Sequence, residues 1–253
     1  MSWKAKVRTL IKIAKRAHKP MLPRGRNLFR DLSNSLPDYE VKVVFDVGAN
    51  VGQSAIAFLR QFSGSRIYCF EPVGPTFRRL EQTLRGEKNA ECFNVALGAT
   101  SGDGTMALQA ESEKAFLYAS PPSDAVNGGG AVQAVKVVTL DEFCDIHEIA
   151  RIHYLKIDTE GGDVEVLKGA SEMLAEQRID LVEVEAGMNP GNERHQPFEA
   201  LKQLLESQAY FLFGIYEQIP ESLVKGPLLR RTNPVFLSDR MIQKSRRSRG
   251  AGT

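Results

Sequence analysis

The sequence predicts an α/β fold, a doubly wound and mostly parallel sheet, and three observations lead to that prediction. First, an apolar run over residues 43–47 ends in a glycine-rich turn and passes directly into a helical pattern. Second, apolar strands that end in an acidic residue recur near Glu71 and Asp158. Third, the 253 residues are 42% apolar and 25% charged, which is ordinary for a globular protein long enough to bury a substantial core.

From residue 41 onward, strands and helices alternate in βαβ units. We expect strands over residues 41–47, 66–70, 91–96, 105–109, 132–140, 152–158, 179–184, 210–216 and 235–238. We expect helices over residues 27–32, 53–62, 75–86, 163–177 and 198–207. The last two strands should close the sheet as a pair. The stretch 119–130, rich in Pro and Gly, is expected to form a long mobile loop over or near the site.

Charge divides the chain into an acidic middle and two basic ends. Residues 1–30 carry ten Lys/Arg and residues 240–253 carry five, with no acid in either segment, so residues 31–239 have a formal net charge of −13. We therefore expect a basic N-terminal helix and connector (1–40), a main domain (41–239) and a basic, disordered tail (240–253). An acidic domain gives no support to nucleic-acid binding.

The first 19 residues form the pattern of a basic amphipathic helix. Such a helix docks on its own domain or on a partner subunit, or it binds an anionic membrane surface.

No stretch approaches the ~18 apolar residues of a membrane span, and no secretory signal is recognisable. Cys69, Cys92 and Cys144 are widely spaced, which argues against a disulfide framework. We expect a cytoplasmic protein. If the N-terminal helix binds lipid, the protein is expected to be peripheral at the inner membrane surface.

The strand-to-helix turn from Gly48 to Gly52 predicts a site for a nucleotide-type cofactor. Gly48 permits a sharp turn, Asn50 tolerates left-handed backbone angles, and Gly52 lets the following helix lie close to the strand. Glu71 follows 19 residues after Gly52, at the tip of the second strand, where a carboxylate can accept hydrogen bonds from a ribose diol. The turn has no Lys to hold phosphates, so S-adenosylmethionine is the cofactor that fits best. The expected cofactor-binding residues are Asp46, Gly48, Ala49, Asn50, Gly52, Gln53, Glu71, Pro72, Asn94 and Ala96.

Several blocks, in this order along the chain, resemble the FkbM family of S-adenosylmethionine-dependent methyltransferases. The blocks are residues 45–52, 70–72, 94–98, 138–143, 155–161 and 166–170. The resemblance implies a class I methyltransferase, with a Rossmann-like doubly wound sheet of about seven strands, mostly parallel with an antiparallel last strand. It also implies O-methylation of a saccharide, glycoconjugate or polyketide-like acceptor. One departure is Gly162-Asp163, where the family usually has a small residue followed by Glu.

Four residues are candidates for the chemistry at the acceptor. Asp158 and Glu160 end the fourth strand, where methyl donor and acceptor should meet, and either could take the acceptor's proton. Lys156 shares a face with Asp158 if the strand is regular. It is either an ion-pair partner of a carboxylate or, if burial lowers its pKa, the base itself. His195 is a base candidate or an exposed loop histidine. We predict that the site holds no metal ion. The alternative is a divalent cation held by Asp158, Glu160 and Glu185.

The acceptor itself is not readable from the sequence. A small molecule or glycan is expected, bounded by residues 110–131 and 187–197, neither of which carries a motif. Two rivals remain open at this point. One is an N- or carboxyl-methyltransferase, because the fold does not fix the acceptor. The other is a non-catalytic adaptor that binds the cofactor and is tethered by its basic termini.

Overall fold

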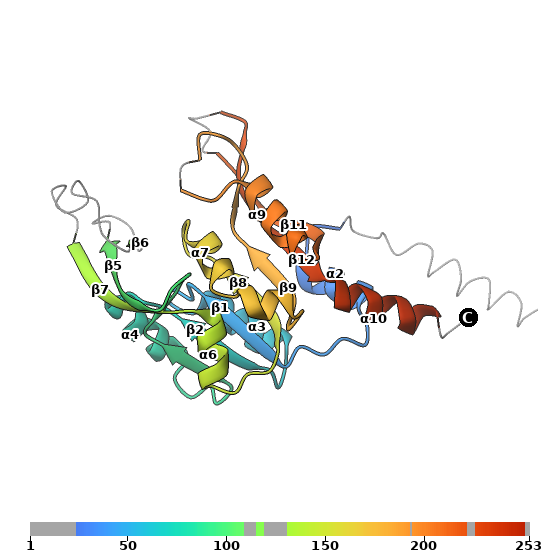
Figure 1. The fold of residues 1–253 in the computed structure, drawn as a ribbon, viewed down its shortest axis with the longest axis horizontal. Coiled ribbons are helices and arrows are strands. Elements are labelled where there is room, and N and C mark those ends of the chain that lie inside the picture. Colours follow the sequence, from blue (N-terminus) through green and yellow to red (C-terminus); the bar gives the residue numbers. More distant parts are fainter. Residues whose placement is uncertain (1–23, 109–114, 119–130, 193, 222–225, 251–253) are drawn as a thin grey trace, which may run out of the picture.

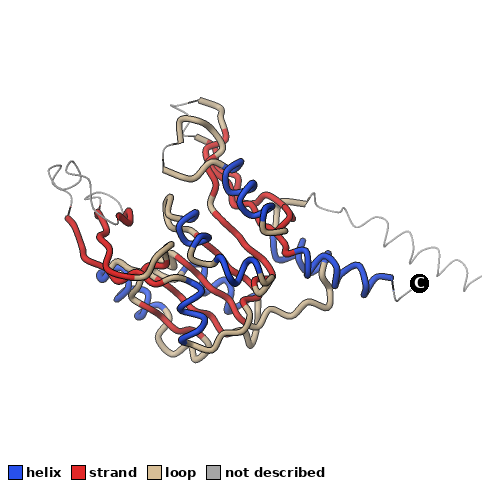
Figure 2. Tube along the Cα trace, viewed as in Figure 1, coloured by secondary structure: helices blue, strands red, loops and turns tan. Residues whose placement is uncertain are grey.

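A computed structural model describes residues 24–108, 115–118, 131–192, 194–221 and 226–250. The chain forms a large sheet flanked by helices and a second, smaller sheet (Figures 1 and 2). The helices are α2 (Leu28–Ser35), α3 (Gln53–Gln61), α4 (Gly74–Thr83), α6 (Leu140–Ile146), α7 (Asp163–Lys168), α8 (Ser171–Ala175), α9 (Phe198–Ser207) and α10 (Asp239–Gly250). The strands are β1 (Val43–Val47), β2 (Arg66–Phe70), β3 (Ala90–Phe93), β4 (Ala96–Leu97), β5 (Gly102–Leu108), β6 (Ala115–Tyr118), β7 (Ala131–Val138), β8 (Ile152–Ile157), β9 (Ile179–Val184), β10 (Ala186–Gly187), β11 (Tyr210–Pro220) and β12 (Leu229–Ser238).

The large sheet is doubly wound because both faces of its central strands are apolar. Successive residues of a strand point to opposite faces, so Val44 and Phe45 on β1 enter two different cores. Phe45 belongs to a core that includes residues of α6, α7, α8 and α9, whereas Val44 belongs to a core that includes residues of α2, α3, α4 and α10. Burial on both faces explains why these strands are continuous apolar runs in the sequence.

The strand order of the large sheet is β10-β12-β9-β8-β1-β2-β3, with β11 paired to β12. β3, β2, β1, β8 and β9 are parallel to one another, and β12 is antiparallel to both β9 and β11. The predicted α/β class with an antiparallel last strand is therefore confirmed. The order reverses between β1 and β8, which is the point where ligands bind in such sheets.

The smaller sheet, in the order β4-β7-β5-β6, was not predicted as a separate unit. It begins at the tip of β3 and stands beyond α4 at one end of the molecule, opposite α10 (Figure 1). Met106, Val135 and Val137 form a small core with Ala96 of β4, in the same sheet, and with Val73, which follows β2 of the large sheet. The side chain of Gln133 on β7 also reaches back to that region: its amide donates to the carbonyl of Pro72.

Several element predictions need correction. The expected helix 163–177 is interrupted at Gly169, where an added Cβ would lie 2.0 Å from the carbonyl oxygen of Gly98, so close backbone contact divides it into α7 and α8. The strand expected over 132–140 ends at Val138, because Thr139 caps α6 by accepting from the N–H of Glu142. Strand 91–96 divides between β3 and β4, which belong to different sheets.

Residues 240–250 of the basic tail that was predicted to be disordered are helical and belong to α10. The helix is anchored at its start, where Met241 is buried against the core and its N–H donates to the hydroxyl of Ser238.

The predicted amphipathic helix over residues 1–19 and the predicted loop 119–130 lie outside the described residues. No helix in the described part of the chain is both long and apolar enough to cross a bilayer.

Candidate active site

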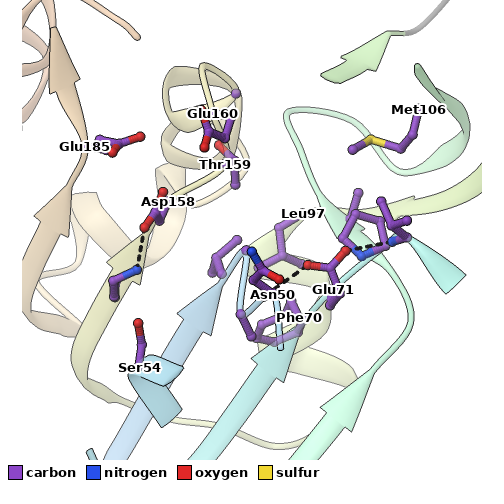
Figure 3. A pocket seen from close by; sticks show the side chains of 18 of the residues that line it. Asn50, Ser54, Phe70, Glu71, Leu97, Met106, Asp158, Thr159, Glu160 and Glu185 are labelled. Carbon is purple, nitrogen blue, oxygen red and sulfur yellow. Dashed lines mark hydrogen bonds and ion pairs between the residues drawn. The ribbon is translucent and has the colours of Figure 1, made fainter. Parts of the chain in front are cut away.

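A cavity of about 640 Å³ opens at the carboxyl ends of β1, β2, β8 and β9. Figure 3 shows its two sides: Asn50, Glu71 and Met106 lie on one side, and Asp158, Glu160 and Glu185 on the other. Its lining includes seven of the ten predicted cofactor residues, which are Gly48, Ala49, Asn50, Gln53, Glu71, Pro72 and Ala96. It also includes three of the four predicted catalytic residues, which are Lys156, Asp158 and Glu160.

The turn after β1 has the backbone geometry that its residues predict. Gly48, Asn50 and Gly52 all have positive φ angles, of 79°, 49° and 96°. A Cβ at Gly48 would lie 2.0 Å from the carbonyl oxygen of Asp158, so this glycine lets the turns after β1 and β8 touch. Gly52 is the N-cap of α3, and the turn therefore delivers the helix N-terminus to the edge of the cavity.

Glu71 is held by the backbone of its own neighbourhood. One carboxylate oxygen accepts from the N–H of Asn50 at 3.1 Å and the other from the N–H of Val73 at 2.8 Å. The side-chain amide of Asn94 donates to the carbonyls of Glu71 and Pro72 and so fixes the segment that carries this carboxylate. Burial raises the pKa of Glu71, and the two backbone hydrogen bonds oppose that rise. Each carboxylate oxygen retains a lone pair for a ligand in the cavity.

Below the cavity, charged residues form a row across three neighbouring strands. Asp46 on β1, Lys156 on β8 and Glu183 on β9 are register partners, and all three are buried. The Lys156 ammonium lies 2.9 Å from a carboxylate oxygen of Asp158 and 3.9 Å from one of Asp46. Burial alone would lower the pKa of Lys156, but these carboxylates outweigh burial and raise it.

The contacts of this row bear on the two interpretations of Lys156. The sequence left open whether Lys156 is an ion-pair partner or a base, and its contact with Asp158 at 2.9 Å, together with its raised pKa, favours the ion pair. Asp158 is the reciprocal case: burial favours the neutral acid, yet the Lys156 ammonium holds the pKa of this carboxyl below its usual range. Burial raises the pKa of Asp46 to about 6, although Lys156 opposes the rise. Lys156 and Asp158 therefore form an ion pair at the floor of the cavity.

Glu160, Glu185 and His195, which we call the acidic corner, converge at the far side of the cavity. The His195 Nε2 atom lies 2.8 Å from Glu185 and 3.7 Å from Glu160. His195 is 4% exposed, so it is not an exposed loop histidine. Arg231 on β12 forms an ion pair with the second oxygen of Glu185.

Close packing holds the two loops of the acidic corner together. Glu160 and Gly161 adopt positive φ angles, and a Cβ at Gly161 would lie 2.4 Å from the carbonyl oxygen of Arg194. The side chain of Gln196 donates to the carbonyl of Gly161. Behind them, Asp163 accepts from the hydroxyl of Thr159 and from the N–H of Glu185, and burial raises the pKa of Asp163 to about 7.

The described residues that line the cavity carry a formal net charge of −3. They include five acids and two bases, which are Glu71, Asp158, Glu160, Glu185, Glu217, Lys156 and Arg231. Both bases are already paired with carboxylates, so this lining offers no cation to a phosphate. A ligand with a ribose diol and a positive charge fits this set, as S-adenosylmethionine does.

Some predicted residues lie just outside the cavity lining. Asp46 lies beneath the lining, Gly52 packs against Leu80 and Thr83 of α4, and Asn94 orients the Glu71 segment. His195 reaches the cavity through Glu160 and Glu185. Met106, Gln133, Glu217 and Arg231 were not among the predicted site residues. These residues belong to the second sheet and to the hairpin β11–β12, and no local motif marks them.

The doubly wound sheet and this cavity define a class I, S-adenosylmethionine-dependent methyltransferase. The chain belongs to the methyltransferase FkbM domain family, whose model matches residues 46–212. This match confirms the family resemblance seen in the sequence blocks.

Two curated relatives are similar over much of the chain. Hexuronic acid methyltransferase AglP of Haloferax volcanii is 29% identical over 157 residues, which span 60% of this chain and 59% of AglP. 2-O-methyltransferase NoeI of Sinorhizobium fredii is 24% identical over 204 residues, which span 75% of this chain and 79% of NoeI. Among solved structures, TrmK of M. capricolum in complex with S-adenosylhomocysteine has a TM-score of 0.46 at 10% identity, covering 84% of this chain and 69% of TrmK.

Proposed function

We propose that this protein methylates a hydroxyl oxygen of a saccharide or glycoconjugate. The observation that carries the proposal is the division of one cavity into two ends: Glu71 at one end suits a ribose, and the acidic corner at the other end suits a hydroxyl. The names of two relatives, a hexuronic acid methyltransferase and a 2-O-methyltransferase, favour a sugar oxygen over a nitrogen or carboxyl acceptor.

At the cofactor end, Glu71 would accept hydrogen bonds from both ribose hydroxyls. Val95, Leu97 and Met106 supply an apolar wall next to it for the adenine ring. The carboxylate of Asp158 lies toward the other end, where it would attract the sulfonium or ammonium charge of the cofactor. Because Glu71 and Asp158 are held in place before any ligand binds, little reorganisation is needed on binding.

S-adenosylmethionine supplies the group: its methyl passes to the acceptor oxygen as the S–CH3 bond breaks, the O–CH3 bond forms and the electron pair of the broken bond stays on sulfur. The chain has to align the acceptor oxygen and receive the hydroxyl proton. Lys156 and Asp158 are committed to their ion pair, so the acidic corner is the proton's destination in this proposal. Glu160 is its most exposed member, with a side chain 23% exposed, and connects it to solvent.

Calorimetric titration with S-adenosylhomocysteine tests the cofactor end. We expect Glu71→Ala to weaken binding by about 1000-fold, because each of two hydrogen bonds to a charged group contributes ~1.5–3 kcal/mol. Glu81→Ala, an exposed carboxylate on the adjacent helix α4, is the matched control and should bind as the wild type does. Equal affinity of the Glu71→Ala variant and the wild type would refute the assignment.

Incubation with deuterated-methyl S-adenosylmethionine tests the acceptor class. We expect mass spectrometry to find the label as a methyl ether on members of a panel of uronic acids, neutral sugars and oligosaccharides. Label found only on amines or carboxylates would overturn O-methylation. A wild-type protein that binds cofactor but labels no acceptor, including a whole metabolite extract, would instead support a non-catalytic role.

We also propose that the protein works in the cytoplasm and contacts anionic lipid through residues 1–19, whose sequence carries basic charge and an apolar stripe. Sedimentation with phosphatidylserine vesicles measures this contact. Deletion of residues 1–19 should abolish co-sedimentation, and unchanged co-sedimentation of the deletion variant would refute it.

A further inference from the structure

We propose that Glu160, Glu185 and His195 bind one first-row divalent cation, with Mn²⁺ as the representative ion, and that this cation binds the acceptor hydroxyl. The inference rests on the proposed function, since it names how the acidic corner activates that hydroxyl. One oxygen of each carboxylate and the imidazole Nε2 all lie within 4.8 Å of one another. Two carboxylates and an imidazole form a donor set that suits such an ion.

The tautomer of His195 follows from the orientation of Asn192. The side-chain N–H of Asn192 donates to the carbonyl of Arg230 at 2.9 Å, so its amide oxygen is the atom that faces the histidine. That oxygen also accepts from the backbone N–H groups of Arg194 and His195. The Nδ1 atom of His195 lies 2.9 Å from the same oxygen and must therefore carry the proton. In neutral His195, the lone pair of Nε2 then faces the two glutamates.

A lone pair directed at two carboxylates is unfavourable unless something positive lies between them. The His195 Nε2 atom and the Glu185 oxygen are buried and 2.8 Å apart, yet they do not have the geometry of a hydrogen bond to each other. Adjacent ligands of an octahedral ion with bonds of ~2.1 Å lie about 3 Å apart, which matches this spacing. A histidine whose second nitrogen is fixed by a neighbouring oxygen is the usual arrangement of a metal ligand.

Local charge also suits one dication. Arg231 neutralises one oxygen of Glu185, and Lys156 neutralises Asp158. Because Asp158 is already paired, His195 takes the place of Asp158 as the third ligand of the cation. The cation would bind the acceptor oxygen and lower the pKa of its hydroxyl, as metal ions do for bound water. The proton would leave through Glu160 to solvent, and the oxygen would then take the methyl group.

Calorimetry with MnCl2 on protein stripped of metal by EDTA tests the site without measuring activity. We expect one Mn²⁺ per chain, with affinity reduced by about 100-fold or more in His195→Gln. Glu160→Gln, at a partly exposed position, is a second variant that keeps the test valid if His195→Gln fails to fold. His147→Gln is the matched control, because His147 stacks on Phe143, outside the cavity lining, and should leave Mn²⁺ affinity unchanged.

Failure of this inference can be told apart from failure of the proposed function. If neither Mn²⁺ nor Zn²⁺ binds the wild type while S-adenosylhomocysteine does, the cation site is wrong and His195 is left as the base. Mn²⁺ affinity that is equal in wild type, His195→Gln and Glu160→Gln would also overturn it. If S-adenosylhomocysteine does not bind, the proposed function is wrong whatever the metal titration gives.

Discussion

At the tips of β1 and β2, the carboxylate of Glu71 is stabilised by two backbone N–H groups, whereas at the tips of β8 and β9 the carboxylates are stabilised by side chains. Asp158 depends on Lys156, and Glu185 depends on Arg231. Backbone support survives any substitution that keeps the turn. Side-chain support requires each partner to be present, so the acceptor end should be far more sensitive to single substitutions.

Removal of the Lys156 ammonium should have the largest effect. Lys156→Met leaves Asp46, Asp158 and Glu183 without their shared cation, and breaking a buried pair in this way costs ~3–5 kcal/mol. Urea unfolding measures the loss. Lys168→Met is the control, since it removes an exposed lysine paired to Glu165 and should cost at most ~0.5 kcal/mol. Similar losses of stability in the two variants would contradict the dependence of the acceptor end on the buried Lys156 ion pair.

Asp163 should make stability depend on pH at the acceptor end. Burial raises its pKa in the folded protein to about 7 from 3.8, so its contribution to stability is complete below pH 3.8 and is lost as pH rises toward 7. Asp163→Asn does not titrate. The free energy of unfolding of the variant relative to wild type should therefore increase by up to ~1.4 kcal/mol per pH unit between pH 4 and 7. Parallel stability curves over that range would contradict the raised pKa.

The smallest effect is expected at Gln133, which connects the second sheet to the cofactor end. Its side chain accepts from the N–H of Gly74 and donates to the carbonyl of Pro72, next to Glu71. Gln133→Ala should weaken S-adenosylhomocysteine binding by about tenfold or less, because it removes support and not a direct contact. Lys136→Ala, exposed on the same strand β7, should not change binding. A loss as large as that of Glu71→Ala would mean that the cofactor end also depends on remote side chains.

The difference between backbone support at the cofactor end and side-chain support at the acceptor end also explains how much of the site the sequence could predict. The cofactor end consists mainly of residues 46–97, where glycine positions and strand tips lie close together in the chain. Its carboxylate, Glu71, was predicted from its spacing after the glycine turn and from its place at a strand tip, and it lines the cavity. The acceptor end combines Glu160 with His195 and Arg231, which only the folded sheet brings together. Burial of His195 could not be predicted, because it depends on Asn192 and on the loop at Gly161. The second sheet and the interruption at Gly169 likewise result from contacts between distant segments.

The reversed direction of β12 has a consequence for how this protein can change. Arg231 lies near the start of β12, close to the connection between β11 and β12. The acceptor end therefore receives its last charged partner from the C-terminal quarter of the chain. Exchange of residues 187–197 and 217–231 between homologous proteins would alter the acceptor end and leave residues 46–97 intact. The proposed acceptor end and the cofactor end therefore depend on different segments of the chain, which makes the hairpin β11–β12 the natural segment to exchange in chimaeric enzymes.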